Sequence, residues 1–230
     1  MSVRFAEVPL IRALPLFKEM SEASFAGMME SSMLQRFPAR ADLIREGEMP
    51  DFLYIVIEGA IDLFATRDGE ESTIDILYPV STFILAAVMR DEPYLKSART
   101  LVPSQLLMVP SQVVRDTFNR DSAFARGIVS ELAARYRSVT RVLKNDRMLS
   151  SSERLANWIL NSARRSGSNE FELPLEKRKL ASYLGMTPES YSRGMTALEQ
   201  HGVHSHGATI TVTDVARLKE FARPALGEDD

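Results

Sequence analysis

The sequence predicts an α+β fold with a β-rich N-terminal domain and a helical C-terminal domain. Residues 34 to 110 contain short apolar or alternating segments separated by turn residues, as in an antiparallel sandwich or rolled barrel. From Ser111 onward the apolar residues take helical spacing, and a small hairpin follows near the C-terminus. A chain of 230 residues with 45% hydrophobic content is long enough to form two modest cores.

A helix is expected before the β-rich region. Apolar spacing predicts it over residues 14 to 30, with Ser21 as a candidate N-cap. Asp68-Gly69 lies between two alternating segments and is a strong signal for a two-residue hairpin, and Glu58-Gly59 marks another sharp turn. The segments expected to form strands are MLQRF, residues 42 to 78 and SARTLVPSQLLMVP.

Residues 121 to 149 predict one long helix with two apolar stripes. The first has the heptad spacing of a coiled coil and consists of Ala125, Val129, Leu132, Tyr136, Val139 and Leu143. The second consists of Phe124, Ile128, Val142 and Leu149. One stripe can pair with a second copy of the chain while the other packs on the β-rich domain, which predicts a homodimer. The alternative is a single amphipathic helix docked within its own chain.

The C-terminal domain is expected to begin near residues 148 to 152. Ser150 and Glu153 form a capping box, which predicts a helix from Glu153 to about Arg165 that ends near Gly167. The residues expected to be buried on this helix are Leu155, Trp158 and Ile159.

Two short helices with a tight corner between them are predicted from Leu175 to Gly202. Gly185 follows the first helix, where a left-handed residue is often needed. Thr187 is a good N-cap and Pro188 a good first residue for the second helix. The apolar face of the first helix consists of Leu180, Ala181 and Leu184.

The second of these helices has an apolar and a polar face. The apolar face consists of Tyr191, Met195 and Leu198, and the polar face of Glu189, Ser192, Arg193 and Thr196. A helix held across its partner can lie in the DNA major groove, where Arg forks to guanine and Glu accepts from cytosine. Thr187 and the phosphate-binding candidates Lys177 and Lys179 complete the predicted DNA contacts. In the alternative, Glu189 and Arg193 form an ordinary i,i+4 ion pair on a solvated helix.

Residues 203 to 213 predict a hairpin around Gly207, and Asp214 is expected to cap a last helix. A hairpin beside a recognition helix is a wing. The three histidines of the chain, His201, His204 and His206, all lie in this region. They predict contacts with phosphate or solvent rather than a metal site, because the chain has no cysteine to complete the ligand set.

The net charge of −3 is unusual for a nucleic-acid binder, but the charge is uneven. The C-terminal GEDD holds three acids, whereas residues 121 to 149 are basic, so weak non-specific affinity with steep salt dependence is expected. Zero cysteines exclude iron–sulfur clusters and thiolate catalysis. No apolar segment is long enough to cross a bilayer and the N-terminus does not resemble a signal peptide, which predicts a cytoplasmic protein without a membrane partner.

These residues together resemble the CRP/FNR family of transcription regulators over nearly the whole chain. The resemblance rests on REGE at residues 45 to 48, LYIVIEG at residues 53 to 59, the long helix, and LASYLGMTPESYSR from Leu180. It implies a cyclic-nucleotide-binding-like β-roll over residues 1–120, a dimerisation helix over 121–149 and a winged helix-turn-helix over 150–230. The E-x-x-S-R pattern of the FNR-like branch is matched by Glu189, Ser192 and Arg193, which implies a palindrome with TTGAT-like half-sites. RNA polymerase is a further expected partner. Tyr191 and Gly194 depart from the usual helix-turn-helix pattern.

The sequence of the β-roll departs from the cAMP-binding members of the family. Those members hold ribose with G-E-L and phosphate with R-S, whereas this chain has FILA from Phe83 and Lys96-Ser97-Ala98. Binding of cAMP is therefore not expected, because the apolar segment cannot accept ribose hydroxyls and Lys lacks the bidentate fork of Arg. FILAAV followed by PYLKSART is similar to the nitric-oxide-responsive denitrification regulators of the family, which implies an effector bound through heme. The candidate effector residues are Phe83, Ile84, Leu85, Lys96 and Ser97.

Three classes of function fit the sequence to different degrees. An enzyme is the poorest fit, since the chain has no cysteine, no histidine before residue 201 and no glycine-rich phosphate loop. A DNA-binding regulator controlled by a small effector fits best. The alternatives are an effector-binding β-roll that acts through protein partners, and a constitutive regulator without a ligand.

Overall fold

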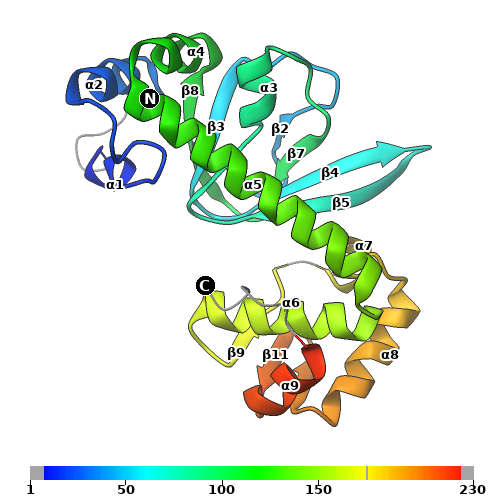
Figure 1. Cartoon of the computed structure of the whole chain (residues 1–230). Coiled ribbons are helices and arrows are strands. Elements are labelled where there is room, and N and C mark those ends of the chain that lie inside the picture. The colour runs from blue at the N-terminus through cyan, green and yellow to red at the C-terminus, as the bar shows by residue number, and fades with distance from the viewer. Residues whose placement is uncertain (1–7, 175, 224–230) are drawn as a thin grey trace. The chain divides into compact units, whose positions relative to one another are not determined.

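The computed structural model describes residues 8–174 and 176–223 (Figure 1). The chain divides into two compact units, Met1–Ser138 and Val139–Asp230, and the division falls inside one long helix. Each unit is built around its own sheet structure.

The first unit contains two four-stranded antiparallel sheets, as expected for a rolled barrel. One sheet has the strand order β1 (Met33–Phe37), β8 (Ser104–Pro110), β3 (Phe52–Glu58) and β6 (Ser81–Phe83). The other has the order β2 (Asp42–Ile44), β7 (Ser97–Thr100), β4 (Ile61–Arg67) and β5 (Glu70–Leu77). The predicted β-rich domain is therefore confirmed.

The two central strands of the first sheet, β3 and β8, are buried on both faces. Leu53, Ile55 and Leu107 point into a core formed with the N-terminal helices. Their neighbours in the sequence, Tyr54 and Val56, point into a second core between the two sheets. This position explains why both strands are continuous apolar segments rather than alternating ones.

Both predicted turns are present. Asp68 and Gly69 both have positive φ and join β4 to β5, with Arg67 paired to Glu70. Gly59, with φ +98°, lies where the chain leaves β3 in one sheet and enters β4 in the other. A Cβ atom at Gly59 would lie 2.2 Å from Ser104 Oγ, so only glycine fits this crossing.

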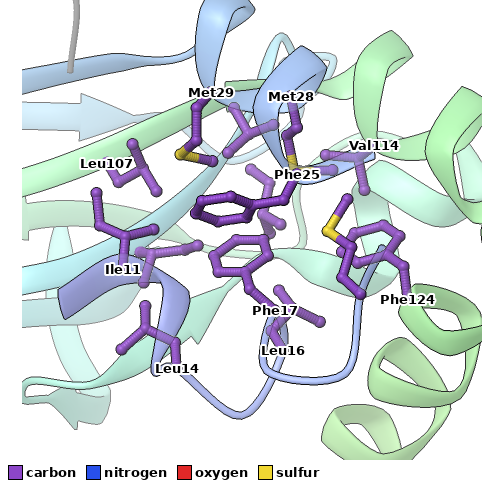
Figure 2. Close-up of a cluster of buried hydrophobic side chains, with 14 of the residues drawn as sticks. Ile11, Leu14, Leu16, Phe17, Phe25, Met28, Met29, Leu107, Val114 and Phe124 are labelled. Carbon is purple, nitrogen blue, oxygen red and sulfur yellow. The ribbon is translucent and has the colours of Figure 1, made fainter. Parts of the chain in front are cut away.

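The helix predicted over residues 14 to 30 is only partly correct. The structure has α1 (Val8–Arg12), a series of turns, and then α2 (Glu22–Ser31), for which Ser21 is the N-cap as expected. Pro15 explains the interruption, because proline has no N–H for the helical bond and disfavours helical geometry in the residue before it. Leu16 and Met20 are nevertheless buried. Figure 2 shows Phe17 in this cluster, stacked on Phe124 at a ring distance of 6.2 Å.

The helical region after the β-strands consists of α4 (Ser111–Arg120) and α5 (Ser122–Met148). The residue between them, Asp121, is buried and joins three segments. One carboxylate oxygen accepts from the backbone N–H groups of Ala123 and Phe124 at 3.0 Å, and the other accepts from Ser21 N–H at 2.9 Å. Hydrogen bonds from the backbone of Phe124 and from Ser21 lower the pKa of Asp121.

Replacing Asp121 with asparagine should therefore reduce the stability of the first unit by about 2 kcal/mol near neutral pH. The pKa of Asp121 is lower in the folded than in the unfolded protein. The ionised carboxylate therefore contributes fully to the free energy of unfolding above its unfolded pKa, and this contribution is lost as the pH falls through the folded pKa. The difference between wild type and variant should shrink below about pH 4, as measured by urea unfolding at several pH values. Asp116→Asn, at an exposed position on α4, is the control and should change stability by less than about 0.5 kcal/mol. A pH-independent difference would contradict the assignment.

The second unit is a small helical domain with a three-stranded sheet. Its elements are α6 (Ser151–Ser166), β9 (Glu170–Glu172), α7 (Lys177–Tyr183), α8 (Pro188–Glu199), β10 (Val203–His206), β11 (Thr209–Val212) and α9 (Val215–Ala222). The predicted capping box of Ser150 and Glu153 is formed, and Gly167 ends α6 in the left-handed region. The hairpin of β10 and β11 and the Asp214 cap of α9 are also confirmed. The sequence did not predict β9, which pairs with β11.

Candidate nucleic-acid interface and effector region

The corner between α7 and α8 has the predicted geometry. Gly185 is left-handed at φ +62°, and Thr187 Oγ1 accepts from Ser190 N–H at 3.2 Å to cap α8. Pro188 is the first residue of α8. The predicted apolar residues of both helices are buried, namely Leu180, Ala181, Leu184, Tyr191, Met195 and Leu198.

The polar face of α8 is exposed to solvent. Glu189, Ser192, Arg193 and Thr196 are all exposed. The Arg193 guanidinium donates to Ser190 Oγ at 3.1 Å, and within the described part of the chain no ion pair within 4.0 Å joins it to Glu189. Hydrogen bonds from its own backbone N–H and from the Thr187 side chain lower the pKa of Glu189 and favour its ionised form. The face therefore presents a guanidinium fork and a carboxylate acceptor.

Gly194 explains how α8 is held so close to α6. It is buried, and a Cβ atom there would lie 3.1 Å from Leu155 Cδ2 of α6. Contact this tight leaves little space for the larger apolar residue that is usual at this position. Tyr191 is also buried, and burial raises the pKa of its phenol.

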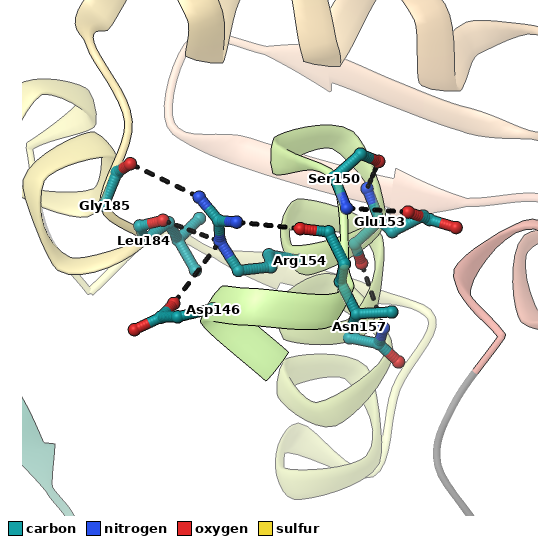
Figure 3. A network of polar contacts seen from close by, with 8 residues as sticks. Asp146, Ser150, Glu153, Arg154, Asn157, Leu184 and Gly185 are labelled. Carbon is teal, nitrogen blue, oxygen red and sulfur yellow. Dashed lines mark hydrogen bonds and ion pairs between the residues drawn. The ribbon is translucent and has the colours of Figure 1, made fainter. Parts of the chain in front are cut away.

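Arg154 of α6 holds the corner between α7 and α8, a role that no pattern in the sequence indicated. Figure 3 shows its guanidinium among backbone oxygens: Nε donates to Leu184 O at 3.1 Å, Nη2 to Gly185 O at 3.3 Å and Nη1 to Leu149 O at 2.9 Å. Asp146 lies 3.5 Å from Nε. Leu184 and Gly185 end α7 and Leu149 follows α5, so one side chain satisfies carbonyl groups at the ends of two helices.

Replacing Arg154 with alanine should lower the free energy of unfolding of the second unit by about 2 to 3 kcal/mol. Three carbonyl groups would lose a charged donor in a partly buried site. Chemical denaturation of the full chain measures the effect. Arg164→Ala is the matched control on the same helix, because Arg164 is exposed, and it should cost less than about 0.5 kcal/mol. Equal losses for the two variants would contradict the role of Arg154.

The three cations at the start of α7 differ in their surroundings. Lys177 and Arg178 are exposed, whereas Lys179 is half-buried. Lys177 and Arg178 line a cleft with Ser192, Thr196 and Ser205. Arg178 and Ser205 were not predicted as candidates, because spacing within one helix does not show which residues of α7 and β10 face α8.

The histidines do not form a metal site among the residues that the structure describes. His201 packs on Phe221 of α9 with a ring distance of 4.3 Å. His204 and His206 are exposed on β10, which is consistent with the predicted contacts with phosphate or solvent.

The apolar members of the predicted effector set are core residues in this structure. Phe83 is buried and stacks on Tyr54 at 5.1 Å, and Leu85 is buried against the N-terminal helices. Ile84 is partly buried with a left-handed backbone at φ +61°. The side chains of Phe83 and Leu85 therefore fill the two cores in this structure, and their place in an effector pocket stays a prediction.

The polar members lie near a charged cluster between the β-roll and α5. Burial lowers the pKa of the Lys96 ammonium, which also interacts with Asp75 and Arg135. Arg135 donates to Thr82 O at 2.8 Å and lies 3.8 Å from Asp75. Ser97 Oγ accepts from Glu46 N–H at 3.0 Å. Of the two polar candidates, Lys96 is thus the one whose pKa is shifted by its surroundings.

Helix α5 carries an exposed apolar strip. Phe124 and Ile128 pack in the core of the first unit, as expected for the second stripe, but Val142 of that stripe is 54% exposed. Leu132 of the first stripe is partly buried against the core. The exposed residues of the first stripe are Val129, Tyr136, Val139 and Leu143. No described helix is long and apolar enough to cross a membrane.

Two family models match the chain. The model described as a cyclic nucleotide-binding domain matches residues 34–121, and the model described as a Crp-like helix-turn-helix domain matches residues 153–221. Together they cover more than half of the chain.

Known proteins are similar over most of the chain. The transcriptional activator protein FnrA of Stutzerimonas stutzeri is 24% identical over 190 residues, 80% of this chain and 78% of that protein. The CRP-like cAMP-activated global transcriptional regulator of Mycobacterium tuberculosis is 22% identical over 215 residues, 90% of this chain and 96% of that protein. The structure of FixK2 from Bradyrhizobium japonicum has a TM-score of 0.75 at 20% identity and covers 84% of this chain and 98% of that one.

The matching models and relatives agree with the motifs that suggested the family. An N-terminal effector-binding domain and a C-terminal DNA-binding domain follow, and they describe a regulator of transcription rather than an enzyme. The chain belongs to the CRP/FNR family of DNA-binding transcription regulators.

Proposed function

We propose that this regulator acts as a homodimer that binds a palindrome with TTGAT-like half-sites. The observation that carries the proposal is the division of α8 into a buried face and an exposed face bearing Glu189, Ser192 and Arg193. These three residues match the E-x-x-S-R pattern of the FNR-like branch. Arg193 would fork to guanine and Glu189 would accept from cytosine.

The functional parts of the proposed regulator follow the predicted boundaries. Residues 1–120 form the sensory β-roll, residues 121–149 the dimerisation helix and residues 150–230 the DNA-binding domain. The exposed strip on α5 supports dimerisation, since large apolar side chains gathered on one helix face are typical of an interface. A DNA-binding regulator works beside the chromosome, so we place it in the cytoplasm, with RNA polymerase as a further partner.

The proposed effector is nitric oxide bound through heme in the sensory domain, and not cAMP. Lys96 supports the exclusion of cAMP, because it is an ammonium without a bidentate fork at the position of the phosphate-binding Arg. The first unit has no histidine, so an axial ligand would come from Met, Tyr or Lys. Constitutive activity without a ligand is the second candidate, favoured by the burial of Phe83 and Leu85 in the cores.

A titration with labelled DNA tests the main proposal. The wild-type protein should bind a TTGAT-N4-ATCAA duplex more tightly than a scrambled duplex of the same composition, by at least about 10³-fold at physiological salt. Equal affinity for the two duplexes would overturn the assignment of the half-site.

Adding 1 mM cAMP should change neither the melting temperature nor the DNA affinity. Binding tighter than about 100 μM would raise the free energy of unfolding by over 1 kcal/mol at this concentration, which thermal unfolding detects. An absorbance spectrum of anaerobically purified protein with added heme and nitric oxide is the companion measurement. A Soret band that shifts with nitric oxide supports the heme proposal, and its absence favours the constitutive candidate.

A further inference from the structure

A pocket of about 330 Å³ lies within the second unit, between α6, β11 and α9 (Figure 1). The turn after α6 also contributes to its wall. Its volume is at the lower end of the ~300 to 1,000 Å³ that is typical of small-ligand sites. In the described part of the chain, none of its lining residues belongs to the sets assigned to DNA, to the effector or to dimerisation. The pocket is therefore separate from those three sites.

Hydrogen bonds join the walls of this pocket to one another. Asn157 of α6 lines the pocket, and its Nδ2 donates to Ala222 O at the end of α9 at 2.8 Å. Val212 of β11 also lines it, and its N–H donates to Asn169 O in the turn after α6 at 2.7 Å. Asn157 and Val212 are 6% and 2% exposed, so they belong to the interior of the unit. The pocket is therefore preformed, as ligand sites usually are.

The rim of the pocket is positively charged. Arg164 of α6 and Lys219 of α9 line it and are exposed, and no aspartate or glutamate is among its lining residues in residues 8–174 and 176–223. The Arg164 guanidinium donates from Nη2 to Oδ1 of Asn161, another lining residue, at 2.7 Å, which holds it at the rim. Two positive charges without a lining acid contrast with the net charge of −3 for the whole chain. They favour a negatively charged ligand.

The C-terminal end of α6 borders the same pocket and acts against an anion. Gly167, which ends the helix, is one of the lining residues. The carbonyl end of a helix carries about half a negative charge. Two full positive charges outweigh it, and Ala163 O and Arg164 O already accept from the Gly167 N–H. The field at the rim therefore still favours an anion.

The pocket also has an apolar part. Leu160 of α6, Val212 of β11 and Val215 of α9 contribute aliphatic side chains to it. A guanidinium beside an ammonium suits a carboxylate, because the guanidinium can bind both oxygens at once. Aliphatic walls suit a hydrocarbon body.

We propose that this pocket binds a small organic carboxylate with a compact apolar body. Arg164 forks to the carboxylate and Lys219 adds charge, while the aliphatic side chains of the pocket contact the body. The DNA-binding unit thus has a ligand site of its own. This inference rests neither on the half-site nor on the effector of the β-roll.

The test is a titration of the full chain, with labelled leucine and valine methyl groups, followed by NMR. The probes are straight, branched and aromatic monocarboxylates of four to ten carbon atoms, each compared with its neutral primary amide. At least one carboxylate should shift the methyl signals of Leu160, Val212 and Val215 with a Kd of about 1 mM or tighter. Its amide should bind at least about tenfold more weakly, because it lacks the charge. The methyl signals of Leu85 and Leu107, in the core of the first unit, should not shift.

Substitutions at the rim test the roles of the two cations. Arg164→Ala should weaken binding of that carboxylate at least about tenfold, and Lys219→Gln about threefold or more. Arg164→Lys should retain part of the affinity, since it keeps the charge and loses the fork. Arg165→Ala is the matched control, because Arg165 is the next residue of α6, is exposed and does not line the pocket. It should leave the affinity unchanged.

Three results would overturn the proposal. In the first, no carboxylate of the panel shifts the pocket methyl signals. In the second, acid and amide bind equally well, so that charge plays no part. In the third, Arg165→Ala weakens binding as much as Arg164→Ala, so that only the total charge of the helix matters. None of these measurements includes DNA, so the half-site can be wrong while the pocket stands.

Discussion

Replacing Arg193 with alanine should reduce affinity for the palindrome by roughly 30-fold to 10⁴-fold. Each bidentate contact with guanine contributes about 1 to 3 kcal/mol of discrimination, and a symmetric dimer loses two. Affinity for the scrambled duplex should change by less than about threefold. Among the described residues the exposed Arg193 guanidinium bonds only Ser190 Oγ, so its removal should leave the fold of α8 intact. Fluorescence anisotropy with both duplexes measures the ratio.

Glu189→Ala is the matched comparison and should behave differently. It should relax the preference at one base pair more than it weakens total affinity, since the variant also removes a carboxylate that repels phosphates. If Glu189 and Arg193 only paired with each other on a solvated helix, both variants would lose a few tenths of a kcal/mol in stability and keep the wild-type preference. Selection of binding sites from randomised half-sites decides between these two interpretations. If the wild type, Arg193→Ala and Glu189→Ala all select the same sequences, recognition of the groove by α8 is refuted.

The second large effect is expected on assembly. Replacing both Tyr136 and Val139 with aspartate should convert the dimer to monomers and abolish palindrome binding, because like charges would face each other across the strip. These two residues are 75% and 67% exposed, so the change should leave the fold of each unit intact. Leu132 is a poorer choice, since it also packs against the core of its own unit.

Sedimentation measures the assembly, and a matched pair of substitutions provides the control. Ala134→Asp with Ser138→Asp adds the same charge to exposed α5 positions that point away from the heptad stripe. This control should remain dimeric. A dimer that survives Tyr136→Asp with Val139→Asp would show that α5 pairs through another face, or that the interface lies elsewhere.

Local signals in the sequence predicted much of the fold. The N-caps at Ser21, Ser150 and Thr187 depend on side chains bonding backbone groups three residues away, so the sequence alone specifies them. The hairpin at Asp68-Gly69 is equally local. The family motifs then supplied the order of the domains.

Interactions between distant residues were not predictable in the same way. Arg154 bonds carbonyl oxygens up to 31 residues away, and carbonyl groups carry no signature in the sequence. The segment from Phe83 was expected at a ligand pocket, but whether an apolar residue fills a core or lines a cavity depends on how the sheets and helices close around it. Pro15 was the one local sign that could have corrected the first helix.

The bonds of Arg154 also have a mechanical consequence. Its guanidinium holds Asp146 and Leu149 at the end of α5 and the carbonyl groups of Leu184 and Gly185 at the corner before α8. A rotation of the last turn of α5 must therefore either break these bonds or carry the corner with it. The Arg154 side chain thus links the two helix ends, so a rotation that starts in the last turn of α5 is coupled to the position of α8.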